Sequence, residues 1–269
     1  MIRPSGGPPL RSGFDTSIPS SARIWNYWMG GKDNYEVDRS AGDEFLKTAP
    51  QISTMARQSR QYLIRAVSVV ADEMGIHQFL DIGAGLPMYD NNTHEVAQRV
   101  APGAKVVYVD NDPLVLVHAQ ALLRSSAPEG VTEFVQGDLH EPEKILDAAA
   151  ETLDFTRPVA LMLMGVLGHI QEYDEATSVV RRLKASLPSG SCLVHYDGVD
   201  TSSQLKEAQD GYGATGAVPY ALRSPEQITA YYEGLDLIEP GVVSCPMWRP
   251  EPGASPVPTD VYGGIARKP

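Results

Sequence analysis

Residues 79–88 read Phe-Leu-Asp-Ile-Gly-Ala-Gly-Leu-Pro-Met. An apolar run that ends in an acidic residue and two glycines is typical of a buried strand followed by a tight turn, because glycine lets the backbone turn sharply and approach a ligand. A dinucleotide-binding turn would need a small residue where Met88 stands. Asn92 and Glu95 predict a helix start, which leaves 86–91 as a loop. The stretch therefore predicts a ligand site that differs from a pyrophosphate-binding turn.

Similar apolar runs alternate with amphipathic segments along the rest of the chain. This alternation predicts an α/β fold, with parallel strands joined by right-handed crossovers and helices on both faces. The last two strands are expected to pair as a terminal hairpin, and 198–219 is expected to be a polar, Gly-rich connection. Strands are expected at 79–82, 106–109, 131–135, 159–164, 192–194, 235–239 and 261–266, and helices at 54–74, 92–100, 113–124, 142–150, 174–186 and 225–233.

Three parts are expected along the chain. Residues 1–14, rich in Pro and Gly, are expected to form a disordered tail, 15–75 an N-terminal helical arm, and 76–269 one ligand-binding domain. Two Trp and two Tyr lie around the glycine pair Gly30-Gly31 of the arm. The arm therefore has two compatible interpretations. It is a helix that packs its aromatic residues on the main body, or a lid whose glycines approach the ligand.

The chain is acidic and contains few cysteines. Its 269 residues include 22 Lys and Arg against 34 Asp and Glu, so the formal net charge is −12, and no basic run offsets it. A nucleic-acid or membrane partner is therefore not expected. Cys192 and Cys245 form no CxxC and no His–Cys cluster, which argues against a disulfide framework and a metal site. With no signal peptide and no bilayer-length apolar run, the sequence favours a cytoplasmic protein.

Acidic residues also follow the next two expected strands. Asp110 comes 25 residues after Gly85, at a position where a carboxylate can accept both hydroxyls of a ribose. Asp138 follows the third strand, where it can accept from the adenine amine while Leu139 packs on the ring. The alternative for this acidic segment is a helix cap, which suits Asp112 better. Three strand ends with an acidic residue in register predict an adenosyl ligand.

These residues resemble the successive motifs of the class I S-adenosylmethionine-dependent methyltransferases. More narrowly, the chain is similar to a bacterial methyltransferase family long known only as a domain of unknown function, over nearly all of Phe14 to Ala266. The Gly-Gly-Lys-Asp-Asn and Val-Tyr-Val-Asp-Asn-Asp-Pro segments are specific, whereas the glycine motif alone is not. The matching segments are 21–35, 79–87, 94–97, 107–113, 234–240 and 248–250.

The resemblance implies a Rossmann-like, mostly parallel seven-stranded sheet with an N-terminal helical arm. It also implies S-adenosylmethionine as the cofactor and S-adenosylhomocysteine as the product. Arg60 is the candidate partner of the cofactor carboxylate, and the alternative for it is a solvated helix charge. The matched cofactor-binding positions and their neighbours are Met29, Gly30, Arg60, Asp81, Gly83, Ala84, Gly85, Asp110, Asn111, His118, Asp138, Leu139, Met164 and Gly165.

Methyl transfer from a sulfonium asks the protein for positioning, exclusion of water and removal of a proton. His169, after the fourth strand, is the leading candidate base, and its alternative is a structural histidine. Tyr27 of the arm is a second catalytic candidate. The candidate acceptor-binding residues are His195 and Asp197 after the fifth strand, together with an aromatic wall of Trp28, Tyr89, Tyr220 and Trp248. These aromatic residues could instead hold the arm and the C-terminal loop in place.

The acceptor cannot be carried over from the family, because residues 88–90 and 165–171 depart from its pattern. Aromatic walls with few polar groups favour a small indole- or phenol-bearing natural product as the acceptor. A homodimer is compatible with the sequence. Two other classes remain open. One is a nicotinamide-dependent oxidoreductase, which Met88 disfavours, and the other is a cofactor-binding sensor without turnover.

Overall fold

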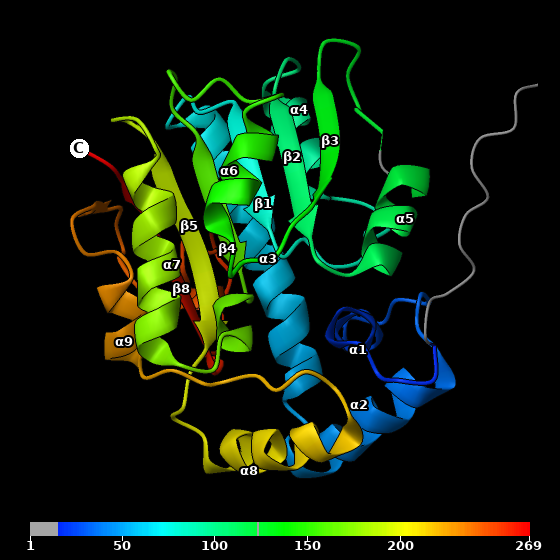
Figure 1. Ribbon diagram of the computed structural model, residues 1–269. Helices are drawn as coiled ribbons and strands as arrows, with labels where there is room; N and C mark the ends of the chain where they lie inside the picture. The colour runs from blue at the N-terminus through cyan, green and yellow to red at the C-terminus, as the bar shows by residue number, and fades with distance from the viewer. Residues whose placement is uncertain (1–15, 123) are drawn as a thin grey trace, which may run out of the picture.

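One sheet of mostly parallel strands organises the molecule. The computed structural model describes residues 16–122 and 124–269 (Figure 1). Strands follow one another in the order β3-β2-β1-β4-β5-β8-β6, and β7 pairs with β8. β8 runs antiparallel to its neighbours, and the other central strands are parallel. The strands are β1 (Gln78–Ile82), β2 (Lys105–Asp110), β3 (Val131–Gln136), β4 (Ala160–Met164), β5 (Cys192–Gly198), β6 (Asp236–Leu237), β7 (Val243–Ser244) and β8 (Val261–Arg267).

Helices cover both faces of this sheet (Figure 1). Side chains of one strand alternate between the faces, so Phe79 joins the core beneath α3 and α4, and Leu80 joins the core beneath α6 and α7. The helices are α1 (Ser21–Trp28), α2 (Glu36–Thr48), α3 (Ile52–Asp72), α4 (Thr93–Val100), α5 (Pro113–Leu122), α6 (Pro142–Ala149), α7 (Tyr173–Ala185), α8 (Ser203–Tyr212) and α9 (Pro225–Ala230), with 3-10 turns η1 (Leu167–His169), η2 (Gly213–Thr215) and η3 (Cys245–Met247).

The Rossmann-like methyltransferase fold expected from the sequence is confirmed. The central sheet has the seven strands of the family pattern, and the short strand β7 adds an eighth in the described residues. β6 and β8 pair antiparallel, as expected for the terminal hairpin. Asn92 and Glu95 form the expected capping box at the start of α4. The capping box spans only four neighbouring residues, and local signals of this kind are the strongest in a sequence.

The segment 198–219 differs from the expected irregular connection. It contains α8, whose N-cap Ser202 accepts a hydrogen bond from the backbone N–H of Leu205 at 3.2 Å. The helix buries Leu205 and Tyr212, and Tyr212 packs against Phe45 of α2 with ring centroids 5.7 Å apart. The prediction was wrong because polar residues dominate this helix, which has one narrow buried face.

The N-terminal helices pack into the apolar core on one face of the sheet. α1 contributes the buried Ile24 and Trp28 to the same apolar cluster that contains Phe79 of β1. α3 packs along α4 and reaches β8. The expected tail, 1–14, lies outside the described residues. The division into an arm at 15–75 and a domain at 76–269 stays a prediction.

Candidate functional site

A cavity of about 420 Å³ lies at the carboxyl edge of the parallel strands. It is lined by the loops that follow β1 to β5, and by residues of α1, α3, α5 and α8. Figure 1 shows α1, α2 and α8 beyond the lower ends of the strands, on the side of the sheet where the cavity lies. Open parallel sheets bind ligands at this edge, near the point where the strand order reverses. Here the reversal occurs between β1 and β4.

The loop after β1 approaches the cavity with two glycines in the left-handed region. Gly83 has φ +74° and Gly85 has φ +65°. A Cβ on Gly83 would lie 2.4 Å from the Val166 side chain, so glycine is required there for packing against the loop after β4. A Cβ on Gly85 would meet nothing within 4 Å, and both residues line the cavity with Ala84. The turn therefore exposes bare backbone to the cavity.

Two opposite charges lie beneath this turn. Asp81 is 3% exposed and accepts a hydrogen bond from the Thr93 hydroxyl at 2.7 Å. Burial raises the pKa of the Asp81 carboxyl to about 6. Arg60 of α3 also lines the cavity, and its Nη2 donates to the carbonyl of Asn91 at 2.8 Å and to the side-chain oxygen of Asn92 at 3.2 Å. Burial lowers the pKa of Arg60. Its hydrogen bonds to the loop and its place in the cavity lining favour the binding role over a solvated helix charge.

Asp110 ends β2 and organises the turn across from it. One carboxylate oxygen accepts from the backbone N–H of Gly85 at 2.9 Å, and the other accepts from the N–H of Asp112 at 2.9 Å. Burial raises the pKa of Asp110. Asp112 accepts from the N–H of Leu114 at 2.8 Å, so the helix-cap role belongs to Asp112 as expected. Asn111 lines the cavity beside them.

The next strand end brings Asp138 and Leu139 to the same cavity. Asp138 accepts from the backbone N–H of His140 at 2.9 Å, and this bond lowers the pKa of Asp138. Leu139 is buried and presents an apolar side chain. His118, expected at this rim, does not line the cavity. α5 turns Val115, Leu116 and Ala119 toward the cavity instead. Neighbouring residues of a helix point in different directions, so His118 faces away from the cavity although the next residue, Ala119, lines it. The sequence pattern did not show which face of this helix turns toward the cavity.

The arm closes one side of the cavity with Trp28 and Met29. Trp28 is 6% exposed and packs at a tilt against Phe45, with ring centroids 4.9 Å apart. The Ser20 hydroxyl donates to Asp112 at 3.0 Å and so joins the arm to the end of β2. The expected wall residue Trp28 is therefore in place.

The glycine pair of the arm forms part of a turn within the arm. A Cβ on Gly31 would lie 2.3 Å from the amide of Asn26, which is buried. The Asn26 oxygen accepts from the Asp33 N–H at 3.1 Å and from the Asn34 amide at 3.0 Å. Gly30 has φ +87° and is exposed outside the cavity lining. Gly30 and Gly31 therefore shape the turn around Asn26, and contact with a ligand does not explain them.

The other end of the cavity lies over β4 and β5. Met164, Gly165 and His169 line it, together with Tyr220. His169 faces the carbonyl of Pro219 through Nδ1 at 3.4 Å, and its ring packs edge-on against Tyr220 with centroids 5.1 Å apart. Burial lowers the pKa of His169, so the imidazole is neutral at neutral pH. A donor Nδ1–H leaves Nε2 free to accept a proton.

A series of buried hydrogen bonds, made by residues outside the cavity lining, holds Tyr220 in place. Its hydroxyl donates to Asp197, and Asp197 also bonds the His195 Nε2 at 2.9 Å. Asp197 and His195 are both fully buried. Gly168 permits this arrangement, because a Cβ there would lie 2.4 Å from the Tyr220 ring. His195 and Asp197 thus support the cavity wall without lining it, which corrects their expected place in the acceptor site.

Three further expected residues also lie outside the cavity. Tyr27 points to α2, where its hydroxyl donates to Asp43 at 2.6 Å, so the structure does not support its catalytic role. Tyr89 is 100% exposed. Trp248 is 0% exposed, and its ring lies 5.6 Å from that of Tyr62 of α3. Trp248 anchors the C-terminal loop, which was the other interpretation of these aromatic residues. Chain positions alone could not say which side of α1 or of the sheet each ring would face.

Several lining residues were not singled out from the sequence. α3 lines the cavity with Met55, Ser59 and Leu63, which are four residues apart on one helical face. α8 adds Leu205, Gln209 and Tyr212, and β5 adds Tyr196. The helical spacing was a usable signal in α3. α8 was missed because it was not expected to be a helix.

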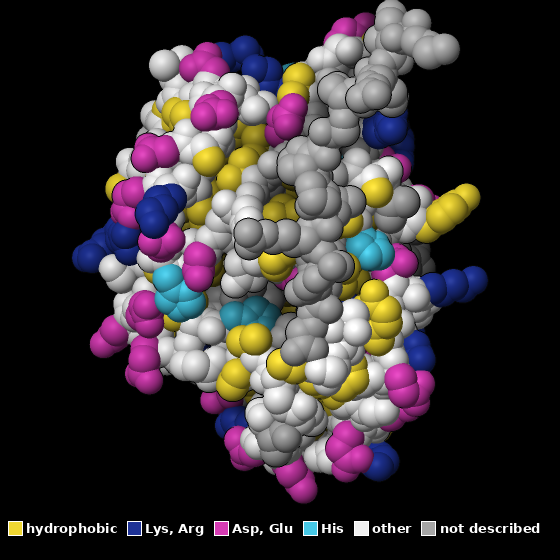
Figure 2. Space-filling view, turned by 45° about the vertical axis from the view of Figure 1, so that its right-hand side comes forward, with side chains coloured by type: hydrophobic (Ala, Val, Ile, Leu, Met, Phe, Trp, Pro, Cys, Tyr) yellow, Lys and Arg dark blue, Asp and Glu magenta, His cyan; other side chains and the backbone are white. Residues whose placement is uncertain are grey.

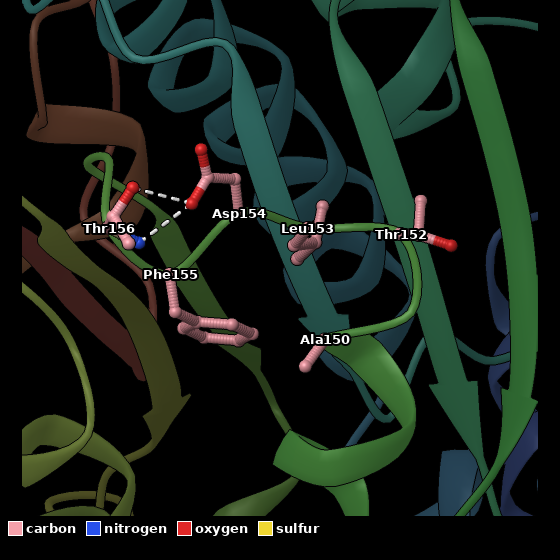
Figure 3. Close-up of a pocket in the computed structure, with 6 residues that line it drawn as sticks. All are labelled: Ala150, Thr152, Leu153, Asp154, Phe155 and Thr156. Atoms are coloured by element: carbon pink, nitrogen blue, oxygen red, sulfur yellow. Dashed lines mark hydrogen bonds between the residues drawn. The ribbon is translucent and has the colours of Figure 1, made fainter.

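A second hollow lies at the opposite edge of the sheet, in the loop between α6 and β4 (Figure 3). Its lining comes from residues 150–156 alone. The only carboxylate among the lining residues, Asp154, already accepts two hydrogen bonds from Thr156, at 2.9 Å from its N–H and 2.6 Å from its hydroxyl. The polar side chains that reach this loop from the sheet, Gln78 and Lys105, bond its backbone, at Asp154 and Thr152 respectively, so they hold the loop in place and offer no catalytic arrangement.

Other features of the described residues bear on partners. No group of three or more His, Cys, Asp or Glu side chains in 16–122 and 124–269 is placed to hold a metal ion. Within the same ranges, no helix combines the length and apolar character needed to cross a membrane. Acidic side chains are spread over the face shown in Figure 2, where Lys and Arg stand in small separate groups.

Comparison with known proteins places the chain in a family. The family model described as S-adenosyl methyltransferase matches residues 9–269. A DUF574-family structure from Streptomyces avermitilis is 42% identical, with a TM-score of 0.89 over 95% of this chain and 99% of the other. A putative methyltransferase from Thermobifida fusca is 38% identical, with a TM-score of 0.87 over 94% and 96% of the two chains.

A more distant structure shares the fold alone. The methyltransferase from Anabaena variabilis, whose name gives it as SAM-dependent, is 11% identical, with a TM-score of 0.51 over 92% of this chain and 95% of the other. No curated protein matched the chain. A family match over nearly the whole chain, joined to a cavity at the ligand-binding edge of the sheet, establishes that the protein belongs to the S-adenosyl methyltransferase family and is an S-adenosylmethionine-dependent methyltransferase.

Proposed function

We propose that the protein methylates a small aromatic acceptor that bears an indole or phenol group. One observation carries this proposal. The cavity is continuous from the polar strand ends at Asp110 and Asp138 to a region over β4 and β5 that is walled by aromatic and aliphatic side chains and contains His169. A volume of about 420 Å³ lies in the range of roughly 300–1,000 Å³ found for small-molecule sites.

The residues of the first region fit the cofactor chemically. Asp81 and Arg60 offer opposite charges to the ammonium and carboxylate of its amino-acid tail. Gly85 leaves open space, and the Asp110 oxygens retain lone pairs for ribose hydroxyls beyond the bonds that they accept. When bound, S-adenosylmethionine supplies an electrophilic methyl group on a sulfonium. Asp138 and Leu139 would hold the adenine.

The second region favours a flat and largely apolar acceptor. Trp25 and Trp28 of α1 form one wall, with ring centroids 5.9 Å apart, and Leu63 of α3 and Leu222 form others. Aromatic side chains pack well against aromatic rings, edge-on or offset. The surplus of acidic residues supports a small-molecule acceptor in preference to a nucleic acid. A homodimer and a cytoplasmic location remain part of the proposal.

His169 is the proposed general base. Its Nδ1 faces a backbone carbonyl, which favours the tautomer with a free Nε2 lone pair. The proton that an acceptor N–H, O–H or ring carbon loses as its bond to the methyl carbon forms would pass to Nε2. Burial lowers the pKa of His169, which favours the neutral imidazole that can accept a proton.

Turnover of indoles and phenols, measured as S-adenosylhomocysteine release, tests the proposal. We expect His169→Ala to lower kcat by about 10²–10⁴-fold, the usual contribution of a general base. His77→Ala is the control, because His77 is exposed beyond the other edge of the sheet. Equal rates for wild type and His169→Ala would exclude His169. Turnover on peptides or nucleic acids alone would exclude the small acceptor, and cofactor binding without any turnover would favour a sensor.

A further inference from the structure

Gln209 is a polar residue in the middle of an otherwise apolar helix face. α8 turns Leu205, Gln209 and Tyr212 toward the cavity, at positions i, i+4 and i+7 of one helical face. Leu205 is 1% and Tyr212 is 5% exposed. An apolar residue would complete this face, so packing alone does not account for Gln209.

The amide oxygen of Gln209 is buried and has no hydrogen-bond partner among the described residues. A buried acceptor without a donor is destabilising, because it has lost its bonds to water and gained none in return. Natural proteins keep such atoms where a ligand or an ordered water supplies the missing donor. The oxygen therefore marks a point at which a donor group is expected.

Gln209 lines the cavity from α8, the helix that packs against the arm and its acceptor-wall residue Trp28. The cofactor residues Asp110 and Asp138 follow β2 and β3, on one side of β1. α8 follows β5, on the other side of β1, and lies across from the arm, where the Tyr212 ring is 6.4 Å from that of Trp28. His169 and Tyr220 line the same side of the cavity.

We propose that Gln209 selects acceptors that carry a second hydrogen-bond donor, an O–H or N–H group besides the atom that is methylated. This inference rests on the proposed function, because it presumes a small acceptor between α1 and α8. The donor group bonds the Gln209 amide oxygen, while the reacting atom lies toward His169. Discrimination arises because an acceptor without the second donor leaves the buried oxygen unpaired.

Paired probes that differ in one donor test the inference. 2,7-Dihydroxynaphthalene has two hydroxyls, and 7-methoxy-2-naphthol has one, on the same ring system. Dissociation constants are measured by calorimetry with the protein saturated with S-adenosylhomocysteine. The wild type is expected to bind the diol about tenfold more tightly, the effect of one neutral hydrogen bond. Gln209→Leu should weaken the diol about tenfold and leave the methoxy compound unchanged.

Two variants complete the design. Gln209→Glu retains an acceptor oxygen and should keep the preference for the diol. Gln204→Leu is the matched control, since Gln204 is exposed on the same helix, and it should bind both probes as the wild type does. A diol preference that survives in Gln209→Leu overturns the inference while the aromatic acceptor stands. If the wild type binds neither probe, the proposed aromatic acceptor fails and the inference fails with it.

Discussion

At the residue scale, the cavity combines two groups of opposite charge under one turn. Asp81 and Arg60 are held by neighbours that come from the loop and helix after β1, such as Thr93 and Asn92. Burial disfavours the charged form of both groups, which is why the pKa of Asp81 rises and that of Arg60 falls. A zwitterionic ligand tail would restore favourable charge interactions for both.

The pKa of Asp81 gives cofactor binding a defined pH dependence. An ammonium group requires the carboxylate form, which predominates only above a pKa of about 6 in the free protein. We therefore expect the dissociation constant of S-adenosylhomocysteine to rise about tenfold per pH unit below that value. Calorimetry between pH 5 and pH 8 measures it. Asp81→Asn should bind weakly and with a flat profile, and an unchanged slope in that variant would remove Asp81 from the site.

Folding of the free protein responds to the same group with the opposite sign. The folded-state pKa of Asp81 lies above its ordinary value of 3.8, so the folded state binds the proton more tightly than the unfolded state. Ionisation of Asp81 therefore lowers the free energy of unfolding as the pH rises from 3.8, the ordinary pKa, to about 6, the pKa in the folded protein. Asp81→Asn should accordingly be at least as stable as the wild type at pH 7 without cofactor.

Asp110 combines a binding role with a structural one. We expect Asp110→Ala to weaken S-adenosylhomocysteine binding by about 1.5–3 kcal/mol, the range for hydrogen bonds to a charged group. Asp110→Asn should lose less, because an amide oxygen can still accept from the Gly85 N–H. Asp90→Ala is the control, since Asp90 is exposed in the following loop. An Asp110→Ala variant with wild-type affinity would contradict the ribose assignment.

At the element scale, a buried ion pair joins α1 to α2. The Arg23 Nε lies 2.7 Å from the Asp38 carboxylate, with side-chain exposures of 4% and 0%. Asp38 also accepts from the backbone N–H groups of Ser20 at 3.0 Å and Tyr35 at 2.8 Å. This carboxylate therefore holds α1 against α2, and α1 with the residue that follows it brings Trp28 and Met29 to the cavity. If the arm acts as a lid, this ion pair keeps the lid in shape.

Removal of Asp38 should loosen the arm. Asp38→Ala leaves Arg23 buried without its partner, so we expect a loss of about 3–5 kcal/mol in the free energy of unfolding. Urea unfolding measures this, and calorimetry of the folded protein should show weaker S-adenosylhomocysteine binding. Glu36→Ala is the control, because its partner Arg39 forms an exposed ion pair on the same helix, which contributes little. Wild-type cofactor affinity in a destabilised Asp38→Ala variant would contradict the lid.

At the scale of the whole molecule, the cavity depends on elements that are far apart in the chain. Strand ends near residues 83, 110 and 138 supply one half, and α1, α3, α8 and the loop around 220 supply the other. The loop is docked on η1 by the Ala221 N–H, which donates to the Gly168 carbonyl at 2.7 Å, and by Arg223, whose Nη2 donates to the Ile170 carbonyl at 2.6 Å. The acceptor region therefore forms only when these elements, which are distant in sequence, pack together in the fold.

Much of the cofactor region could be predicted from the sequence. Asp81, Gly83, Gly85, Asp110 and Asp138 each stand at the end of an apolar run, and the carboxyl ends of parallel strands meet at one edge. Local order along the chain therefore implied spatial proximity. The acceptor region followed no such rule, and its aromatic residues were assigned from composition alone.

The sequence by itself determined the α/β class, the parallel core, the cofactor edge and the helix caps, because strand periodicity, glycine turns and capping residues act over a few neighbouring residues. Only the tertiary structure decided which aromatic rings face the cavity. Tyr27 and Trp248 turn toward α2 and α3, whereas Trp28 and Tyr220 turn inward. Side-chain direction depends on how each helix is rotated against its partners, and that rotation is set by packing between elements distant in sequence.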